Sequence, residues 1–133
     1  MKKLLSVVGI LVIVFSPVSM GAANPIDLAG TEWGFTGDVG KAARFIQFRS
    51  DGRVTGSSGC NRFTGEYAQD GGTLIMGTLA TTRMACPPEI MQREQEFLAL
   101  LGKIRHVDRT NHHLTLKDGD GNVLAELIWR ELD

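Results

Sequence analysis

The stretch FIQFRSDGRVTG, residues 45–56, carries the clearest fold signal in the sequence. Three apolar residues precede the dipeptide Asp51-Gly52, and Val54 follows it. Asp-Gly between two apolar runs is typical of an antiparallel hairpin, because the tight turn needs backbone conformations that glycine adopts readily. This stretch therefore predicts two short strands joined by a turn.

The same device recurs twice along the chain. EYAQDGGTLIMG, residues 66–77, has Asp-Gly-Gly at its centre, and HHLTLKDGDGNVLAELIW, residues 112–129, has apolar residues alternating on both sides of DGDGN. We expect one further strand near TEWGFTG, residues 31–37, and one near GTLATTR, residues 77–83. About eight short strands then form a mostly antiparallel sheet or an incomplete barrel.

One segment has helical character instead. In PPEIMQREQEFLALLG, residues 87–102, Pro88 suits a first helical turn and Gly102 suits a helix end. We expect one main helix over about residues 88–101, which makes the fold class α+β.

Glu94 interrupts the apolar side of this helix. The apolar stripe consists of Ile90, Phe97, Leu98 and Leu101. A carboxylate buried on this face loses several kcal/mol of hydration unless donors surround it. Two alternatives stay open: Glu94 leans out to solvent, or it meets Arg62, Arg83 or the amide of Asn61.

The N-terminus predicts export. Two lysines precede the apolar run LLSVVGILVIVF, residues 4–15, and small residues Gly21 and Ala23 follow it. This is the pattern of a secretory signal peptide, residues 1–23, cleaved near Ala23. A retained anchor is the alternative, although a run this short does not span a bilayer with ease. We expect a periplasmic or secreted protein with no stable membrane span after cleavage.

The remaining residues, 24–133, are enough for a single domain with a modest core. Loss of the two signal-peptide lysines changes the formal net charge from −1 to −3. Nucleic-acid binding requires a basic surface, and this domain has a negative net charge. We therefore expect no nucleic-acid partner. We expect a monomer.

The chain has two cysteines, Cys60 and Cys86. Cys60 lies in the corner GCNRF, residues 59–63, where a nucleophile, a metal ligand and one end of a disulfide are all open. Export favours a Cys60–Cys86 disulfide, because an oxidising compartment lets two thiols persist as a bond.

No other motif in the sequence points to chemistry. GSSGC, residues 56–60, has Cys60 where a nucleophile elbow needs glycine. The histidines lack the spacing of a zinc site, and DGDGN, residues 118–122, departs from a calcium loop in the positions that follow. GDVGK, residues 37–41, lacks the spacing of a phosphate-binding loop. We expect no catalytic residue, cofactor or metal.

Four segments carry a family resemblance: GRVTGSSGCNRFTGEY, LATTRMACP, REQEFLALL and LTLKDGDGNVL. Together they resemble the META domain, the HslJ-like family of small bacterial envelope proteins, over about residues 28–129. The resemblance implies one α+β domain whose strands wrap partly around a helix. It also implies association with heat shock, stress response and antibiotic tolerance, without a defining catalytic activity. Many bacterial members carry a lipid-anchoring cysteine after the signal, and this sequence has none there.

Within this family, we expect a cluster of polar residues to hold two chain connections against the helix: Asn61, Arg62, Thr82, Arg83 and Glu94. The function expected is that of a non-enzymatic exported envelope protein, which supports envelope integrity or stress and antibiotic tolerance by binding a partner. The alternative is a binding module for a small apolar or lipid-like ligand held between sheet and helix.

Overall fold

The computed structural model describes residues 9–14 and 26–131, so the predicted signal peptide lies largely outside the described residues. The described part contains one α-helix, a short 3-10 helix η1 and nine strands. The helices are α1 (Pro88–Lys103) and η1 (Gly40–Ala42). The strands are β1 (Thr31–Gly34), β2 (Phe45–Phe48), β3 (Arg53–Ser57), β4 (Arg62–Asp70), β5 (Thr73–Met76), β6 (Ala80–Thr81), β7 (His106–Arg109), β8 (His113–Lys117) and β9 (Val123–Arg130).

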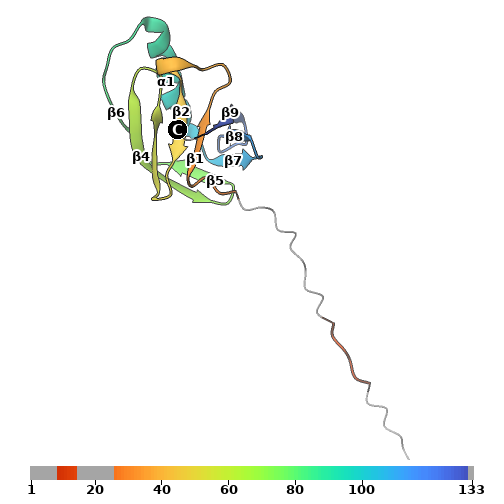
Figure 1. Cartoon of the computed structure of the whole chain (residues 1–133). Helices are drawn as coiled ribbons and strands as arrows, with labels where there is room; N and C mark the ends of the chain where they lie inside the picture. The colour runs from red at the N-terminus through yellow and green to blue at the C-terminus, as the bar shows by residue number, and fades with distance from the viewer. Residues whose placement is uncertain (1–8, 15–25, 132–133) are drawn as a thin grey trace, which may run out of the picture.

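The strands form an antiparallel ring (Figure 1). They run in the order β3-β2-β1-β9-β8-β7-β5-β4, and a further pairing between β3 and β4 closes the ring. β6 lies outside the ring, paired with β4. The predicted α+β class is confirmed. The sequence predicted a mostly antiparallel sheet or an incomplete barrel, and the structure is a closed barrel.

The three predicted hairpins are present. Gly52 and Gly71 have φ values of 84° and 56°, the left-handed conformations that glycine adopts without a Cβ clash. In the first hairpin Phe48 lies opposite Val54, so the apolar residues of both strands face the same side. β7 is a strand that the sequence analysis missed, because Val107 is the only apolar residue in it.

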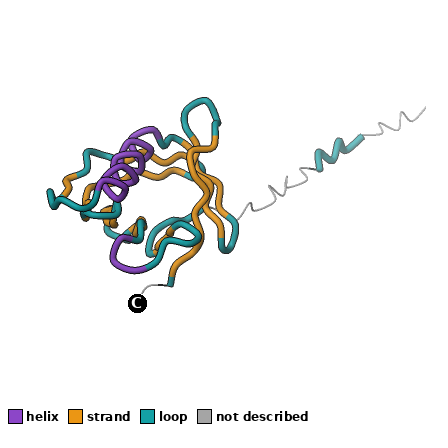
Figure 2. The backbone as a smooth tube through the Cα atoms, turned by 90° about the horizontal axis from the view of Figure 1, so that it is seen from above, coloured by secondary structure: helices purple, strands orange, loops and turns teal. Residues whose placement is uncertain are grey.

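The helix α1 begins at Pro88 as expected and ends one residue beyond Gly102. The capping position is Ile104, whose N–H donates to the carbonyl of Leu101, so the expected cap at Gly102 is wrong. Phe97 and Leu101 are buried among the core residues. Viewed from above, α1 lies along one side of the ring of strands (Figure 2).

Candidate functional site

A disulfide joins Cys60 to Cys86, with the two Cα atoms 5.9 Å apart. It links the connection between β3 and β4 to the segment that leads into α1. A loop of 26 residues closed in this way stabilises the folded chain by about 3.5 kcal/mol, through the entropy removed from the unfolded chain. The bond therefore fixes the corner GCNRF against the start of the helix.

Asn61 is the centre of the hydrogen-bond network at this corner and is only 4% exposed. Its Oδ1 accepts from the Thr82 hydroxyl at 2.9 Å and from the Met84 N–H at 2.6 Å. Its Nδ2 donates to the Met84 carbonyl at 3.2 Å and to Glu94 Oε2 at 2.8 Å. The side-chain amide of Asn61 thus ties the segment before α1 to the helix itself.

Glu94 is buried, at 4% exposure, and is surrounded by neutral donors. Its Oε1 accepts from the Asn61 N–H at 2.6 Å and from the Ser58 hydroxyl at 2.7 Å. Burial by itself raises the pKa of Glu94, but the hydrogen bonds from Ser58 and Asn61 outweigh it, so the pKa lies below the ordinary value. Of the two alternatives for Glu94, the structure has the buried one.

Glu94 has no cationic partner in the described structure, contrary to part of the expectation. The Arg62 N–H donates to the Thr82 hydroxyl at 3.0 Å, but its guanidinium makes no hydrogen bond to the described residues. The Arg83 side chain is exposed and joins no hydrogen bond of the network. The structure thus brings Asn61, Thr82 and Glu94 together, includes Arg62 only through its backbone, and leaves both arginine side chains outside the network.

Two participants in the network were missed from sequence. Ser58 is fully buried, and its hydroxyl lies 2.7 Å from Glu94 Oε1 and 2.9 Å from the Asn61 carbonyl oxygen. Met84 participates only through its backbone, which no side-chain pattern reveals. Gly59 has a φ of 125°, whereas Asn61 is not left-handed, so glycine alone makes the sharp bend at this corner.

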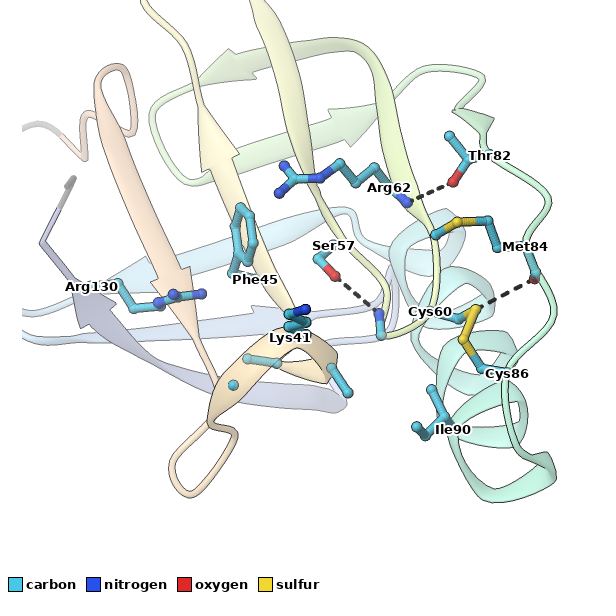
Figure 3. A pocket seen from close by; sticks show the side chains of 14 residues that line it. Lys41, Phe45, Ser57, Cys60, Arg62, Thr82, Met84, Cys86, Ile90 and Arg130 are labelled. Carbon is cyan, nitrogen blue, oxygen red and sulfur yellow. Dashed lines mark hydrogen bonds between the residues drawn. A yellow bond between two sulfur atoms is a disulfide. The ribbon is translucent and has the colours of Figure 1, made fainter.

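A surface pocket of about 570 Å³ opens beside the disulfide (Figure 3). It lies between η1, the β3–β4 connection and the start of α1. Three cationic side chains line it, and its lining contains no acidic residue. The residues of this basic pocket are Gly40, Lys41, Ala42, Ala43, Phe45, Ser57, Gly59, Cys60, Arg62, Thr82, Met84, Cys86, Ile90 and Arg130.

Asp38 holds the η1 side of the basic pocket in place. Its carboxylate pairs with Arg44 at 2.8 Å and with Arg93 of α1 at 3.0 Å. Burial by itself raises the pKa of Asp38, but the hydrogen bonds and charge of Arg44, together with the charge of Arg93, outweigh it, so the pKa lies below its ordinary value. The loop that carries η1 is therefore tied to the helix by a partly buried ion-pair cluster.

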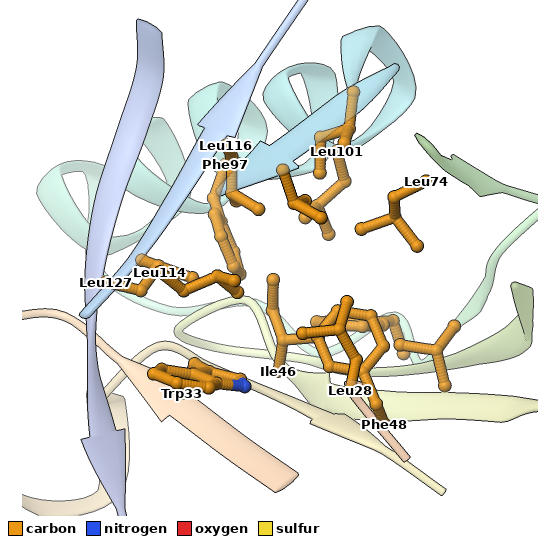
Figure 4. Close-up of a cluster of buried hydrophobic side chains, with 14 residues drawn as sticks. Leu28, Trp33, Ile46, Phe48, Leu74, Phe97, Leu101, Leu114, Leu116 and Leu127 are labelled. Atoms are coloured by element: carbon orange, nitrogen blue, oxygen red, sulfur yellow. The ribbon is translucent and has the colours of Figure 1, made fainter. Parts of the chain in front are cut away.

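Apolar side chains fill the space between the sheet and the helix (Figure 4). Phe97 and Leu101 of α1 belong to the same buried cluster as Leu114 and Leu116 of β8, and all four are at most 1% exposed. The complete set of buried apolar residues in this cluster is Leu28, Trp33, Ile46, Phe48, Val54, Phe63, Leu74, Phe97, Leu101, Ile104, Val107, Leu114, Leu116 and Leu127. Core side chains therefore occupy most of the space where the alternative function places a ligand. A smaller pocket of about 280 Å³ remains between the β5–β6 region and α1, lined by Met76, Gly77, Leu79, Thr81, Leu98 and Gly102.

Two further properties concern only the described ranges 9–14 and 26–131. Within them, no group of three or more His, Cys, Asp or Glu residues is arranged to hold a metal ion. Among those same residues, no helix has both the length and the apolar character needed to cross a membrane.

Comparison with known proteins gives one family and three similar structures. The model of the META domain family matches residues 26–128. An NMR structure of a protein from Burkholderia xenovorans is 28% identical to this chain, with a TM-score of 0.63, and the match covers 80% of this chain and 85% of that one. A second NMR structure is also 28% identical, with a TM-score of 0.56 over 77% of this chain and 90% of that one.

A crystal structure of a DUF4847 family protein from Bacteroides vulgatus is 15% identical, with a TM-score of 0.57 over 80% of this chain and 96% of that one. This third likeness concerns the fold alone. No curated protein matches the sequence.

Proposed function

This chain belongs to the META domain family, and from that premise we propose that it is an exported envelope protein that acts by binding, without turnover of a substrate. Its role is to support envelope integrity under stress such as heat or an envelope-crossing antibiotic. The observation that carries this proposal concerns the polar corner formed by Ser58, Asn61 and Glu94. The side chains there that are best suited to chemistry are buried and hydrogen-bonded to one another.

The pair Ser58 and Glu94 is the nearest approach to a nucleophile beside a base. Their side-chain oxygens lie 2.7 Å apart, which is the distance such a pair needs. Ser58, however, is 0% exposed and Glu94 is 4% exposed, so a substrate has no access to either. The hydrogen bonds that lower the pKa of Glu94 also make it a poor proton acceptor. These properties support a structural role for the pair.

The disulfide supports export. Cys60 and Cys86 are bonded, and disulfides persist in oxidising compartments and are rare in the cytosol. The apolar run of residues 4–15, with two lysines before it, supports the same proposal from the sequence.

The alternative function is the binding of a small ligand. The structure favours the basic pocket as the binding place over the expected place between sheet and helix. Core side chains fill most of the space between sheet and helix and leave there a pocket of about 280 Å³, whereas the basic pocket, at about 570 Å³, is twice that size and opens at the surface. A small ligand therefore belongs in the basic pocket, where polar groups and apolar walls occur together.

A complementation experiment tests the proposal. Deletion of the gene is expected to sensitise cells to heat or to an envelope-crossing antibiotic, and the wild-type gene is expected to restore tolerance. Ser58→Ala, expressed at the same level in the periplasmic fraction, is expected to restore tolerance too, because the buried hydroxyl has no chemical step to perform. A version without residues 1–23 is the control for export and is expected to fail.

The non-enzymatic proposal is wrong if Ser58→Ala folds, reaches the periplasm and fails to complement, while purified wild-type protein hydrolyses ester, peptide or glycan substrates and the variant does not. Export is wrong if the full-length protein is recovered only from the cytoplasmic fraction.

A further inference from the structure

We propose that the basic pocket binds a small phosphomonoester that carries an apolar substituent. This inference rests on the proposed binding function and deepens it by naming the site and the ligand class. It comes from the charge of the pocket, from polar donors there without acceptors, and from its apolar walls.

The charge of the basic pocket suits a dianion. Lys41, Arg62 and Arg130 line it from three separate parts of the chain, and Figure 3 shows the ends of Arg62 and Arg130 directed toward Phe45 from opposite sides. Only Arg130 has an acidic partner among the described residues, Glu32, at 3.5 Å. Three cations and one carboxylate leave a formal charge of +2. A phosphomonoester carries about −1.5 to −2 at pH 7, which balances that charge.

Two polar groups of the lining retain unused donors. Arg130 Nη1 is buried and is the one such side-chain atom without a hydrogen-bond partner in the described part of the chain. Ser57 is 7% exposed, and its hydroxyl oxygen accepts from the Gly59 N–H at 3.3 Å. The hydroxyl proton of Ser57 has no acceptor among the described residues. Phosphate oxygens are acceptors that suit both an arginine fork and a hydroxyl.

The remaining lining is apolar and suits a ligand with an apolar substituent. Phe45 and Ile90 are partly exposed there, and Met84 is 58% exposed. The Arg130 guanidinium stacks over the Phe45 ring at 4.7 Å, so the cation is held directly beside an apolar surface. A volume of about 570 Å³ is the size of a small-molecule site.

The walls of the basic pocket are fixed before any ligand arrives. The disulfide holds Cys60 and Cys86, and the Asp38 ion pairs hold the loop that carries η1. A site formed in advance loses little conformational entropy on binding, which favours affinity.

The test is an NMR titration of ¹⁵N-labelled protein produced from the full-length gene, with hexyl phosphate as the probe. Backbone amides of Lys41, Ser57, Gly59 and Cys60 are expected to shift, while those of the remote turn at residues 118–122 are not. Hexyl phosphate is expected to bind at least fivefold more tightly than inorganic phosphate, which lacks the apolar part, and than hexanol, which lacks the charge.

Charge-removal variants locate the binding. Lys41→Gln and Arg62→Gln are each expected to weaken hexyl phosphate binding about fivefold, because each removes one exposed cation that has no ion-pair partner within residues 26–131. Arg83→Gln is the matched control: it lies between two lining residues, Thr82 and Met84, yet does not line the pocket. Its affinity is expected to be unchanged.

A second arm distinguishes a soluble ligand from a lipid headgroup. Cosedimentation with phosphatidylcholine vesicles that requires added phosphatidate, and that Arg62→Gln abolishes, identifies a lipid as the source. Binding of hexyl phosphate without such cosedimentation identifies a soluble ligand. Either result supports the proposed site.

The proposal is overturned if hexyl phosphate shifts none of the pocket amides, if hexanol binds equally well, or if Arg83→Gln weakens binding as much as Arg62→Gln. Such a result, with gene complementation intact, rejects the ligand and leaves the proposed envelope function standing. Failure of complementation by the wild-type gene rejects the function independently of any titration.

Discussion

Replacement of Glu94 by glutamine tests how the polar corner is held. In Glu94→Gln, the retained oxygen keeps the bonds from the Asn61 N–H and the Ser58 hydroxyl, at 2.6 and 2.7 Å in the parent. The new NH2 group then faces Asn61 Nδ2, which donated to Oε2 at 2.8 Å. Asn61 cannot reverse its amide to adapt, because its Oδ1 already accepts from Thr82 and Met84.

One hydrogen bond to a charged group is therefore lost, and two donors are left facing each other in a buried site. A bond of this kind contributes about 1.5–3 kcal/mol, so we expect Glu94→Gln to lower the free energy of unfolding by about 2–3 kcal/mol at pH 7. Glu89→Gln is the control on the same helix. Glu89 is exposed in the first turn, where its charge interacts favourably with the helix dipole. We expect Glu89→Gln to lower the free energy of unfolding by about 0.5 kcal/mol.

The pH dependence gives the second half of this test. Because the folded-state pKa of Glu94 is lowered, its stabilisation is fully present above the unfolded-state pKa of about 4.3 and is lost as pH falls through the folded value. The wild-type and Glu94→Gln stabilities should therefore converge below about pH 4.

Urea titrations at several pH values measure both effects, with equal m values required for a valid comparison. A loss in Glu94→Gln no larger than in Glu89→Gln at pH 7 would refute the reasoning, as would a difference that stays constant down to pH 3.

Three further predictions concern the same region. Replacing Cys60 and Cys86 together by alanine should lower the free energy of unfolding by about 3.5 kcal/mol in urea, and unreduced denatured wild-type protein should show no free thiol. Asn61→Asp should destabilise by about 3 kcal/mol at neutral pH, because it places a second carboxylate 2.8 Å from Glu94, with partial recovery in acid; an unchanged melting temperature would contradict this. Asp38→Asn should cost about 1–2 kcal/mol at pH 7 and less below about pH 4, since its folded-state pKa is lowered; a pH-independent loss would show that charge is not the cause.

Local signals account for the elements that the sequence predicts correctly. The turns at Gly52 and Gly71 and the start of the helix at Pro88 depend on backbone preferences of a few neighbouring residues. The strand β7 lacks such a signal because its burial comes from a single residue, Val107, packed in a core built by other elements. The prediction that Gly102 caps the helix was wrong, because the helix continues to Lys103 and its C-cap is Ile104.

The sequence by itself determined the α+β class, the three hairpins, the single helix and the importance of Glu94, because each depends on periodicity or on one residue out of pattern. It also favoured the disulfide through the expected compartment. Only the tertiary structure decided that β3 pairs with β4 to close the ring, and that neutral donors, not arginines, hold Glu94. It alone brought Lys41, Arg62 and Arg130 around one pocket. These last features join residues far apart in the chain, and their geometry follows from how the whole barrel packs, which no local propensity encodes.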